Sequence, residues 1–125
     1  NVGGAMRAAG CYGASLVVVE GQRFKRTATD TRKLWRHVPL LQAKLWDSIP
    51  FDCVPVVVEI CNKAKDIRKF THPQRAFYIF GPEDGSVPNE IIERCSNVIY
   101  VPTSNCMNLA ATVNVVLYDR FIKQS

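Results

Sequence analysis

The sequence predicts an α/β domain with a mostly parallel sheet and helices on both faces. Short apolar segments of strand length alternate along the chain with segments of helical character. The apolar segments are continuous rather than alternating with polar residues, so both faces of these strands are expected to be buried. The length of 125 residues suits a single domain, residues 1–125, with a moderate core.

The first part of the chain is predicted to form a helix followed by a strand. Residues 1–14 are rich in small side chains and are expected to be helical up to Gly13, because glycine is common just after a helix end. Residues 15–20 contain three consecutive valines, and a short β-branched run of this kind is typical of a buried strand. Residues 21–37 are the most basic segment, and part of it is expected to be helical.

The rest of the chain alternates connections, strands and helices. Further buried strands are predicted at residues 54–60, 76–80 and 97–101. The segments around them are predicted to be a connection with a short helix at 40–47, a short amphipathic helix or turn at 62–70, a helix at 88–95 and a long helix at 107–124. Between Val113 and Tyr118 the long helix is apolar nearly all round, which indicates either a dimer interface or burial within its own domain.

Two loops follow the carboxyl ends of predicted strands, where open α/β sheets bind their ligands. They are GPEDG, residues 81–85, and PTSNCMN, residues 102–108. Gly81 and Gly85 allow main chain to approach a ligand closely and permit positive φ angles, and a proline stiffens each loop. Both loops are therefore candidates for binding a small molecule through main-chain groups. The alternative for GPEDG is a tight structural connection.

Several kinds of site are not expected. The dinucleotide fingerprint G-x-G-x-x-G, the P-loop and the G-x-S-x-G elbow do not occur. The five cysteines lack C-x-x-C spacing, which favours reduced thiols in a cytoplasmic protein and no metal site. We expect no secretory signal and no membrane span. His37 and His72 are expected to be surface residues, since neither has an acidic neighbour in the sequence.

The charge distribution points to a polyanionic partner. The net charge is +5 and the isoelectric point is about 9.1, a balance that favours polyanions. The basic segment also contains Phe24 and Trp35. Cations neutralise phosphates and aromatic rings stack on unpaired bases, which suits RNA. The expected RNA-binding residues are Arg23, Lys25, Arg26, Arg32, Lys33 and Arg36, the alternative being a solvated loop.

Three segments match the motifs of a known family in order. NVGGAMR, residues 1–7, matches N-x-G-x-x-x-R. IFGPEDGSVP, residues 79–88, resembles a strand followed by G-x-E-x-x-G, and VPTSNCMNLAATVNVVLYD, residues 101–119, resembles the third motif and its helix. The chain thus resembles the SpoU (TrmH-like) branch of the SPOUT RNA methyltransferases. The resemblance covers nearly the whole chain and is weakest at residues 21–50.

The resemblance implies both a fold and an activity. It implies a C-terminal deep trefoil knot that binds S-adenosylmethionine, a homodimer, and methyl transfer to a ribose 2′-hydroxyl of tRNA or rRNA. General topology rules argue against a knot, since knots are rare. The strand that usually precedes motif one is not seen before residue 1, and we expect either that the sequence starts after it or that the sheet lacks this element. The alternatives are a non-catalytic RNA-binding or assembly protein that keeps the knotted fold, and an unrelated α/β enzyme that binds a nucleotide through GPEDG.

The resemblance also assigns site residues. The catalytic residues would be Asn1, Arg7, Glu83 and Asn108. The cofactor pocket would be lined by Glu59, Ile60, Gly81, Val101, Cys106, Met107 and Leu109. Cys106 stands where the family usually has serine, and a thiol is a weaker hydrogen-bond partner than a hydroxyl. This departure favours the non-catalytic alternative slightly.

Individual roles can be stated for three of these residues. Arg7 is expected to be essential, either as the base usually named for the family or as a contact for a phosphate or a developing alkoxide. The second role suits a guanidinium better, because it stays charged. Glu83 is expected to organise the site, and Asn108 is expected to brace its loop by bonding backbone groups at a helix start.

Overall fold

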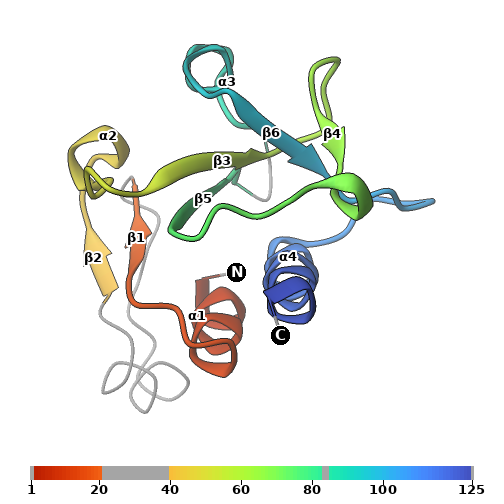
Figure 1. Cartoon of the computed structure of the whole chain (residues 1–125). Coiled ribbons are helices and arrows are strands. Elements are labelled where there is room, and N and C mark those ends of the chain that lie inside the picture. The colour runs from red at the N-terminus through yellow and green to blue at the C-terminus, as the bar shows by residue number, and fades with distance from the viewer. Residues whose placement is uncertain (1, 21–39, 83–84, 125) are drawn as a thin grey trace.

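The computed structural model describes residues 2–20, 40–82 and 85–124, which form an α/β fold (Figure 1). The helices are α1 (Val2–Cys11), α2 (Leu45–Ser48), α3 (Asn89–Arg94) and α4 (Leu109–Gln124), with a 3₁₀ turn η2 (Ile67–Lys69). The strands are β1 (Val17–Val19), β2 (Leu40–Gln42), β3 (Val54–Val58), β4 (Lys65–Asp66), β5 (Ala76–Phe80) and β6 (Asn97–Tyr100).

The main sheet has four strands in the order β4-β6-β3-β5, and β1 and β2 form a separate two-stranded sheet. Every strand pairing among the described residues is parallel, as predicted. In the centre of the main sheet Val57 of β3 lies between Ile79 of β5 and Val98 of β6. Because the strands are parallel, their carboxyl ends lie at one edge of the sheet, which is where the candidate site is built.

The core is divided between the two faces of this sheet. Val57, fully buried, packs with Ile79, Val98 and the side chains of α3. Its neighbours Val56 and Val58 point the other way and pack with Ile99 and with Val116 of α4, because successive side chains of a strand alternate between faces. Figure 1 shows the same arrangement, with α3 on one face and α1 and α4 on the other.

Most predicted elements are present, with differences in the connections. The strand predicted at 76–80 matches β5, and the long C-terminal helix matches α4. Gly13 has a φ of 71° just beyond α1, which confirms the predicted helix stop. The segment 40–47 was expected to hold a short helix, but it begins with strand β2 and the helix starts only at Leu45. The segment 62–70 includes the expected turn, η2, and also the short strand β4.

Burial differs from the prediction in β1, α4 and β5, the last of which lies at the edge of the main sheet and buries Ile79 alone. The valines of β1 are half-buried rather than buried, since this strand belongs to the small sheet and not to the central one. Helix α4 buries Val113 and Val116 but leaves Val115 and Tyr118 exposed, so within one chain it is not buried all round. No helix among the described ranges is both long enough and apolar enough to cross a membrane.

Candidate functional site at the carboxyl edge of the sheet

The loops after β5 and β6 flank the end of β3. They are not adjacent to one another, because β3 lies between β5 and β6 in the sheet. Neighbouring strands are about 4.8 Å apart, so the loops leave the sheet edge about 10 Å from each other. The first residue after β3 is Glu59, and its main-chain N–H donates to the carbonyl of Ile99 in β6 at 2.9 Å. The end of β3 is thus tied to β6 on one side.

The side chain of Glu59 ties the end of β3 to the loop on the other side. Its Oε1 accepts a hydrogen bond of 2.8 Å from the N–H of Val87, 28 residues further along the chain. Its Oε2 accepts from the N–H of Ile60 at 3.2 Å. Both carboxylate oxygens are therefore bonded to main-chain donors. Val87 is 3% exposed and packs in the core beneath α3, so the end of the GPEDG loop is anchored as well.

Gly81 allows the loop to fold back onto itself. A Cβ atom at this position would lie 2.9 Å from the nitrogen of Val87 and 3.1 Å from the carbonyl carbon of Ser86. Real Cβ contacts are essentially never so short, so a side chain here would push the returning loop away. The close neighbour of Gly81 is the loop itself, as in the alternative of a tight structural connection, so the predicted close approach of main chain to a ligand stays a prediction. The positive φ angles allowed for Gly81 and Gly85 do not occur, since Gly13 alone has one within the ranges described.

The loop after β6 leads directly into α4. Asn108 Oδ1 accepts a hydrogen bond of 2.8 Å from the N–H of Ala111, and the Asn108 carbonyl accepts from the N–H and hydroxyl of Thr112. Asn108 thus caps α4, which is the bracing contact expected from the sequence. Cys106 is exposed, whereas Met107 is half-buried.

The apolar side chains at this edge differ in exposure. Ile60, directly after Glu59, is 73% exposed. Val101 and Leu109 are half-buried at the end of β6 and the start of α4. An exposed isoleucine beside loops rich in main-chain polar groups is a suitable surface for a ligand with both an apolar and a polar part.

The proposed catalytic residues are only partly described. Arg7 is exposed on α1, next to the buried Met6 and Ala8, and α1 packs along α4. Asn1 and Glu83 lie outside the described residues. So do all the predicted RNA-binding residues: Arg23, Lys25, Arg26, Arg32, Lys33 and Arg36.

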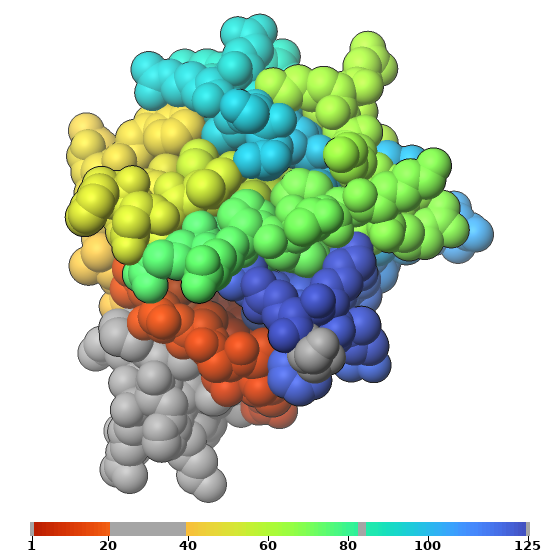
Figure 2. Space-filling model, in the orientation of Figure 1, coloured from red at the N-terminus to blue at the C-terminus, as the bar shows by residue number. Residues whose placement is uncertain are grey.

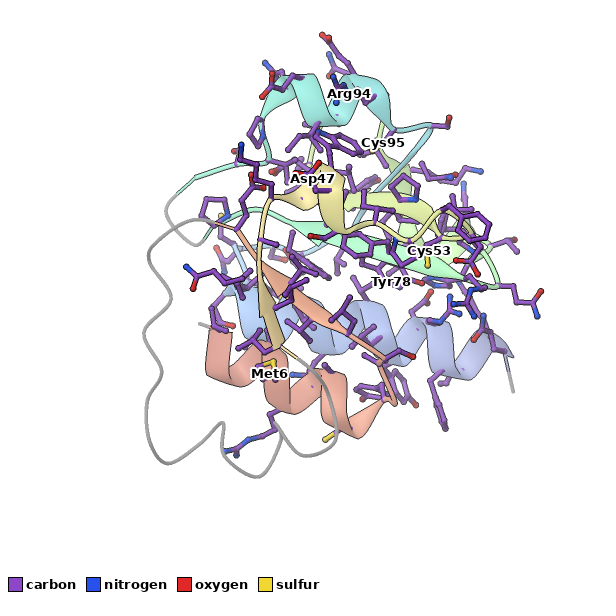
Figure 3. The ribbon with its side chains drawn as sticks, turned by 90° about the vertical axis from the view of Figure 1, so that its left-hand side faces the viewer. Met6, Asp47, Cys53, Tyr78, Arg94 and Cys95 are labelled. Atoms are coloured by element: carbon purple, nitrogen blue, oxygen red, sulfur yellow. The ribbon has the colours of Figure 1, made fainter. Side chains whose placement is uncertain are left out.

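His72 is not a surface residue, and the prediction that it lacks an acidic partner was wrong. Its side chain is 1% exposed, and Nε2 lies 2.7 Å from Oδ2 of Asp119 in α4. Its Nδ1 lies 2.7 Å from the hydroxyl of Tyr78 in β5, a residue labelled in Figure 3. Asp119 is 47 positions away in sequence, so local reading could not pair it with His72.

The tautomer of His72 follows from its neighbours. Arg120 donates to the Tyr78 hydroxyl at 3.1 Å, so that hydroxyl is available to donate to His72 Nδ1. The proton of the neutral ring is then on Nε2, which donates to Asp119. Asp119 also accepts from Lys123 at 2.9 Å. This network joins α4 to β5 and to the segment before it.

Acid is expected to destabilise the fold through His72. Burial lowers the pKa of His72 below its ordinary value, although the hydrogen bond to Asp119 opposes this effect. The stability contributed by the neutral ring is therefore present above the unfolded-state pKa, about 6.5, and is lost as the pH falls towards the folded-state pKa. Urea unfolding between pH 7.5 and pH 5.5 should show a fall in the free energy of unfolding. Over the same pH range the free energy of unfolding of His72→Gln should fall less. An equal fall in that variant would show that the pH dependence does not come from His72.

A pocket of about 340 Å³ lies beside this network, lined by Arg68, Lys69, Phe70, Thr71, His72, Lys123 and Gln124. Its cations are largely engaged within the protein. Arg68 forms a hydrogen-bonded pair with Asp66 that lowers the pKa of this carboxyl group to about 2. Lys123 donates to the carbonyls of Ile67 and Phe70 as well as to Asp119. The pocket is therefore a poor anion site.

Of two features of the carboxyl edge, one was missed and the other was predicted. The contact between Glu59 and Val87 was not foreseen, although the position of a single acid after a run of three valines was a usable signal. The capping role of Asn108 was foreseen from its place before a helix. No group of three or more potential metal ligands occurs in the part of the chain described, and all five cysteines are free.

The chain is similar to known proteins in both sequence and structure. The sequence model of the SpoU rRNA Methylase family matches residues 1–118. The SpoU methyltransferase AviRb from Streptomyces viridochromogenes aligns over 98% of this chain and 54% of its own, with a TM-score of 0.82 and 17% identity. AviRb in complex with the cofactor AdoMet aligns over 98% of this chain and 55% of its own, at a TM-score of 0.78 and 16% identity.

Two further solved structures share the fold. The A. aeolicus TrmH/SpoU tRNA modifying enzyme aligns over 98% of this chain and 68% of its own, with a TM-score of 0.84 and 14% identity. A structure described as giving insights into the 2-OH methylation of C/U34 on tRNA aligns over 98% and 82%, with a TM-score of 0.78 and 21% identity. None of the curated protein sequences matches the chain. The chain spans about half the length of AviRb.

Proposed function

Since the chain belongs to the SpoU rRNA Methylase family, we propose that it transfers a methyl group from S-adenosylmethionine to a ribose 2′-hydroxyl of tRNA or rRNA. The observation that carries the proposal is the family match over residues 1–118, which contains the first two motif segments and almost all of the third. The AdoMet-bound AviRb structure supports the choice of methyl donor. The 2-OH methylation named for one relative supports the choice of acceptor.

The residues at the carboxyl edge of the sheet are suited to S-adenosylmethionine. The exposed Ile60 and the half-buried Val101 and Leu109 offer apolar surface, and the two loops offer main-chain polar groups. Gly81 and Met107 belong to the same proposed pocket, with Cys106 in the place of the usual serine. The bound cofactor supplies an electrophilic methyl group. The protein's task is to orient the acceptor and to help remove its proton.

Arg7 and its neighbours would act on the RNA. The 2′-hydroxyl must approach in line with the methyl–sulfur bond and lose its proton. We assign Arg7 to the neighbouring phosphate or to the developing alkoxide, with a phosphate or water accepting the proton, because a guanidinium remains charged. Asn1 and Glu83 are proposed to organise the site around Arg7, and Asn108 to hold the start of α4.

The proposal also covers the fold of the chain, its location and its contacts with RNA. We propose one domain over residues 1–125 with a deep trefoil knot in its C-terminal third, acting in the cytoplasm. The six cations of the basic segment are proposed to bind RNA phosphates. If they do, the affinity for RNA should fall steeply as the salt concentration rises, because bound counterions are released on binding.

The activity can be tested by product analysis. Purified protein, labelled S-adenosylmethionine and a mixture of unmodified tRNA and rRNA fragments should yield RNA that, after digestion, contains a 2′-O-methylated nucleoside. A DNA oligonucleotide serves as a control because it lacks the 2′-hydroxyl. Cofactor binding without methylation of any RNA would support the non-catalytic alternative. Absence of cofactor binding by intact protein would contradict the proposal.

A homodimer is proposed on the basis of an apolar surface formed by α4 and by Tyr12, the residue that follows α1. We call it the α1–α4 patch, and it comprises Tyr12, Val115, Tyr118, Phe121 and Ile122. The α4 members are 37% to 59% exposed. The ring of Tyr12 lies 6.3 Å from that of Tyr118 and 6.2 Å from that of Phe121. Figure 2 shows the two helices side by side on one face of the molecule.

Phe121→Glu is expected to convert the dimer into a monomer. Phe121 is 59% exposed, so the substitution should leave the free energy of unfolding of a single chain nearly unchanged. A carboxylate in an apolar interface would be desolvated without a partner, which weakens association strongly. Light scattering coupled to gel filtration measures the mass. A monomeric mass for the unsubstituted protein would contradict the dimer, and Gln124→Glu, one helical turn further along, is a matched surface control.

A further inference from the structure

Glu59 is bonded to three separate parts of the carboxyl edge. Its main chain is bonded to β6, and its side chain is bonded both to its own strand end and to the loop that returns from β5. The bond from the Val87 N–H to Oε1 is 2.8 Å long. Of the contacts described, this one joins the end of β3 through a side chain to Val87, two residues beyond the GPEDG segment.

The returning loop is held at both ends by different means. It starts at Gly81, where β5 ends, and it comes back close enough that the Val87 nitrogen occupies the space of a Cβ atom on Gly81. Between them the N–H of Gly85 donates to the carbonyl of Pro82 at 3.3 Å. The loop therefore closes on itself at Gly81, and the Glu59 carboxylate fixes the point of closure relative to β3.

The chemistry of Glu59 suits a positioning role. A carboxylate bonded to a main-chain N–H makes a charge-assisted hydrogen bond, which is stronger than a bond between neutral groups. Since both of its oxygens are engaged by main-chain donors, the side chain is committed to the protein. An unpaired N–H at the buried Val87 would be costly, so the loop would have to move if the acceptor were removed.

We propose that Glu59 is a positioning residue that fixes Val87 against Gly81, at the end of β5, for the binding of S-adenosylmethionine, without contacting the cofactor through its carboxylate. This inference rests on the proposed function. It replaces the direct cofactor contact implied by family resemblance with an action through Val87. It also explains the glycine at position 81. The Val87 nitrogen that donates to Glu59 is the same atom that a Cβ on Gly81 would contact.

The test compares two replacements of Glu59 by calorimetry with S-adenosylmethionine. Glu59→Ala removes the acceptor and should raise the dissociation constant on the order of 10-fold, as expected for a lost charge-assisted bond. Glu59→Gln keeps a carbonyl acceptor for Val87 but removes the charge, and it should bind within about twofold of the unsubstituted protein. Loss of binding in Glu59→Gln equal to that in Glu59→Ala would overturn the proposal, because an acceptor retained for Val87 would then make no difference to cofactor binding.

A second substitution probes the same contact from the other side. Gly81→Ala places a Cβ against the Val87 nitrogen and should weaken cofactor binding in the same way. If both changes act through one loop, the double variant Glu59→Ala/Gly81→Ala should bind about as weakly as the weaker single variant. The proposal would be contradicted if the fold increases in dissociation constant of the two single variants multiplied in the double variant. Glu93→Ala, an exposed acid on α3, is a matched control and should bind normally.

A readout that needs no cofactor separates this inference from the proposed function. Hydrogen exchange should show faster exchange of the Val87 amide in Glu59→Ala than in Glu59→Gln, whatever the protein binds. Unchanged exchange would overturn the positioning role. If the unsubstituted protein fails to bind S-adenosylmethionine while the exchange difference is present, the proposed function fails and the contact between Glu59 and Val87 stands. Equal cofactor binding by the unsubstituted protein and Glu59→Ala would leave the function intact and refute this inference.

Discussion

Replacement of Arg7 by alanine is expected to lower the rate of methyl transfer by about 10²–10³-fold, the cost of removing one preorganised group that stabilises charge in a transition state. Arg7 is exposed on α1, so its loss should change the free energy of unfolding little. It belongs to none of the elements at the cofactor edge, so S-adenosylmethionine binding should also be retained. The measurement is the initial rate of methyl transfer to an RNA that the unsubstituted protein methylates.

The kinetic constants distinguish two roles for Arg7. A contact with a ground-state phosphate predicts a raised KM for RNA with kcat nearly unchanged, whereas stabilisation of a developing alkoxide predicts a lowered kcat. Arg7→Lys retains the charge but loses the planar donor fork, so it should recover part of the activity. Full activity in Arg7→Ala, with a normal unfolding profile, would remove Arg7 from the site.

Truncation of isoleucine to alanine should mainly lower the stability of the fold at Ile99 and mainly weaken cofactor binding at Ile60. Ile99 is fully buried in the cluster formed by β3, β6 and α4. Truncation there should lower the free energy of unfolding by about 2–5 kcal/mol, because a cavity remains in the core. Ile60 is 73% exposed, and its truncation should cost less than about 0.5 kcal/mol.

Cofactor binding should rank the two variants the other way. Ile60→Ala removes apolar surface from the proposed pocket and should raise the dissociation constant for S-adenosylmethionine by about 3–10-fold, whereas folded Ile99→Ala should bind nearly as well as the unsubstituted protein. Urea unfolding and calorimetry on the same samples provide both numbers. Unchanged binding by Ile60→Ala would exclude Ile60 from the pocket.

Strands β3 and β5 were predictable because their apolar residues form continuous runs. Val56, Val57 and Val58 of β3 are consecutive, and no charged residue interrupts β5 between Ala76 and Phe80. The order of the strands was not predictable, since pairing joins segments that are distant in sequence. Strands β2 and β4 were missed because they lack the β-branched run that marks β1: β2 reads LLQ and β4 reads KD, whereas β1 reads VVV.

The site was predictable where a local pattern determines the structure. Asn108 precedes a long helix, and an asparagine there caps it whatever the rest of the fold does. The contacts of Glu59 and His72 depend on residues 28 and 47 positions away, and only the folded chain brings these together. The family resemblance supplied roles for Arg7 and the cofactor residues that composition and spacing alone do not provide.

The packing of α1 against α4 has a consequence for how the chain folds during synthesis. The first helix buries Met6, Ala8 and Ala9, and it packs against the helix that ends at Gln124. Translation proceeds from the N-terminus, so α1 leaves the ribosome long before the helix that covers it exists. The nascent chain must therefore hold an uncovered apolar helix until α4 has been synthesised. We expect protease resistance of α1 to arise only once α4 has left the ribosome.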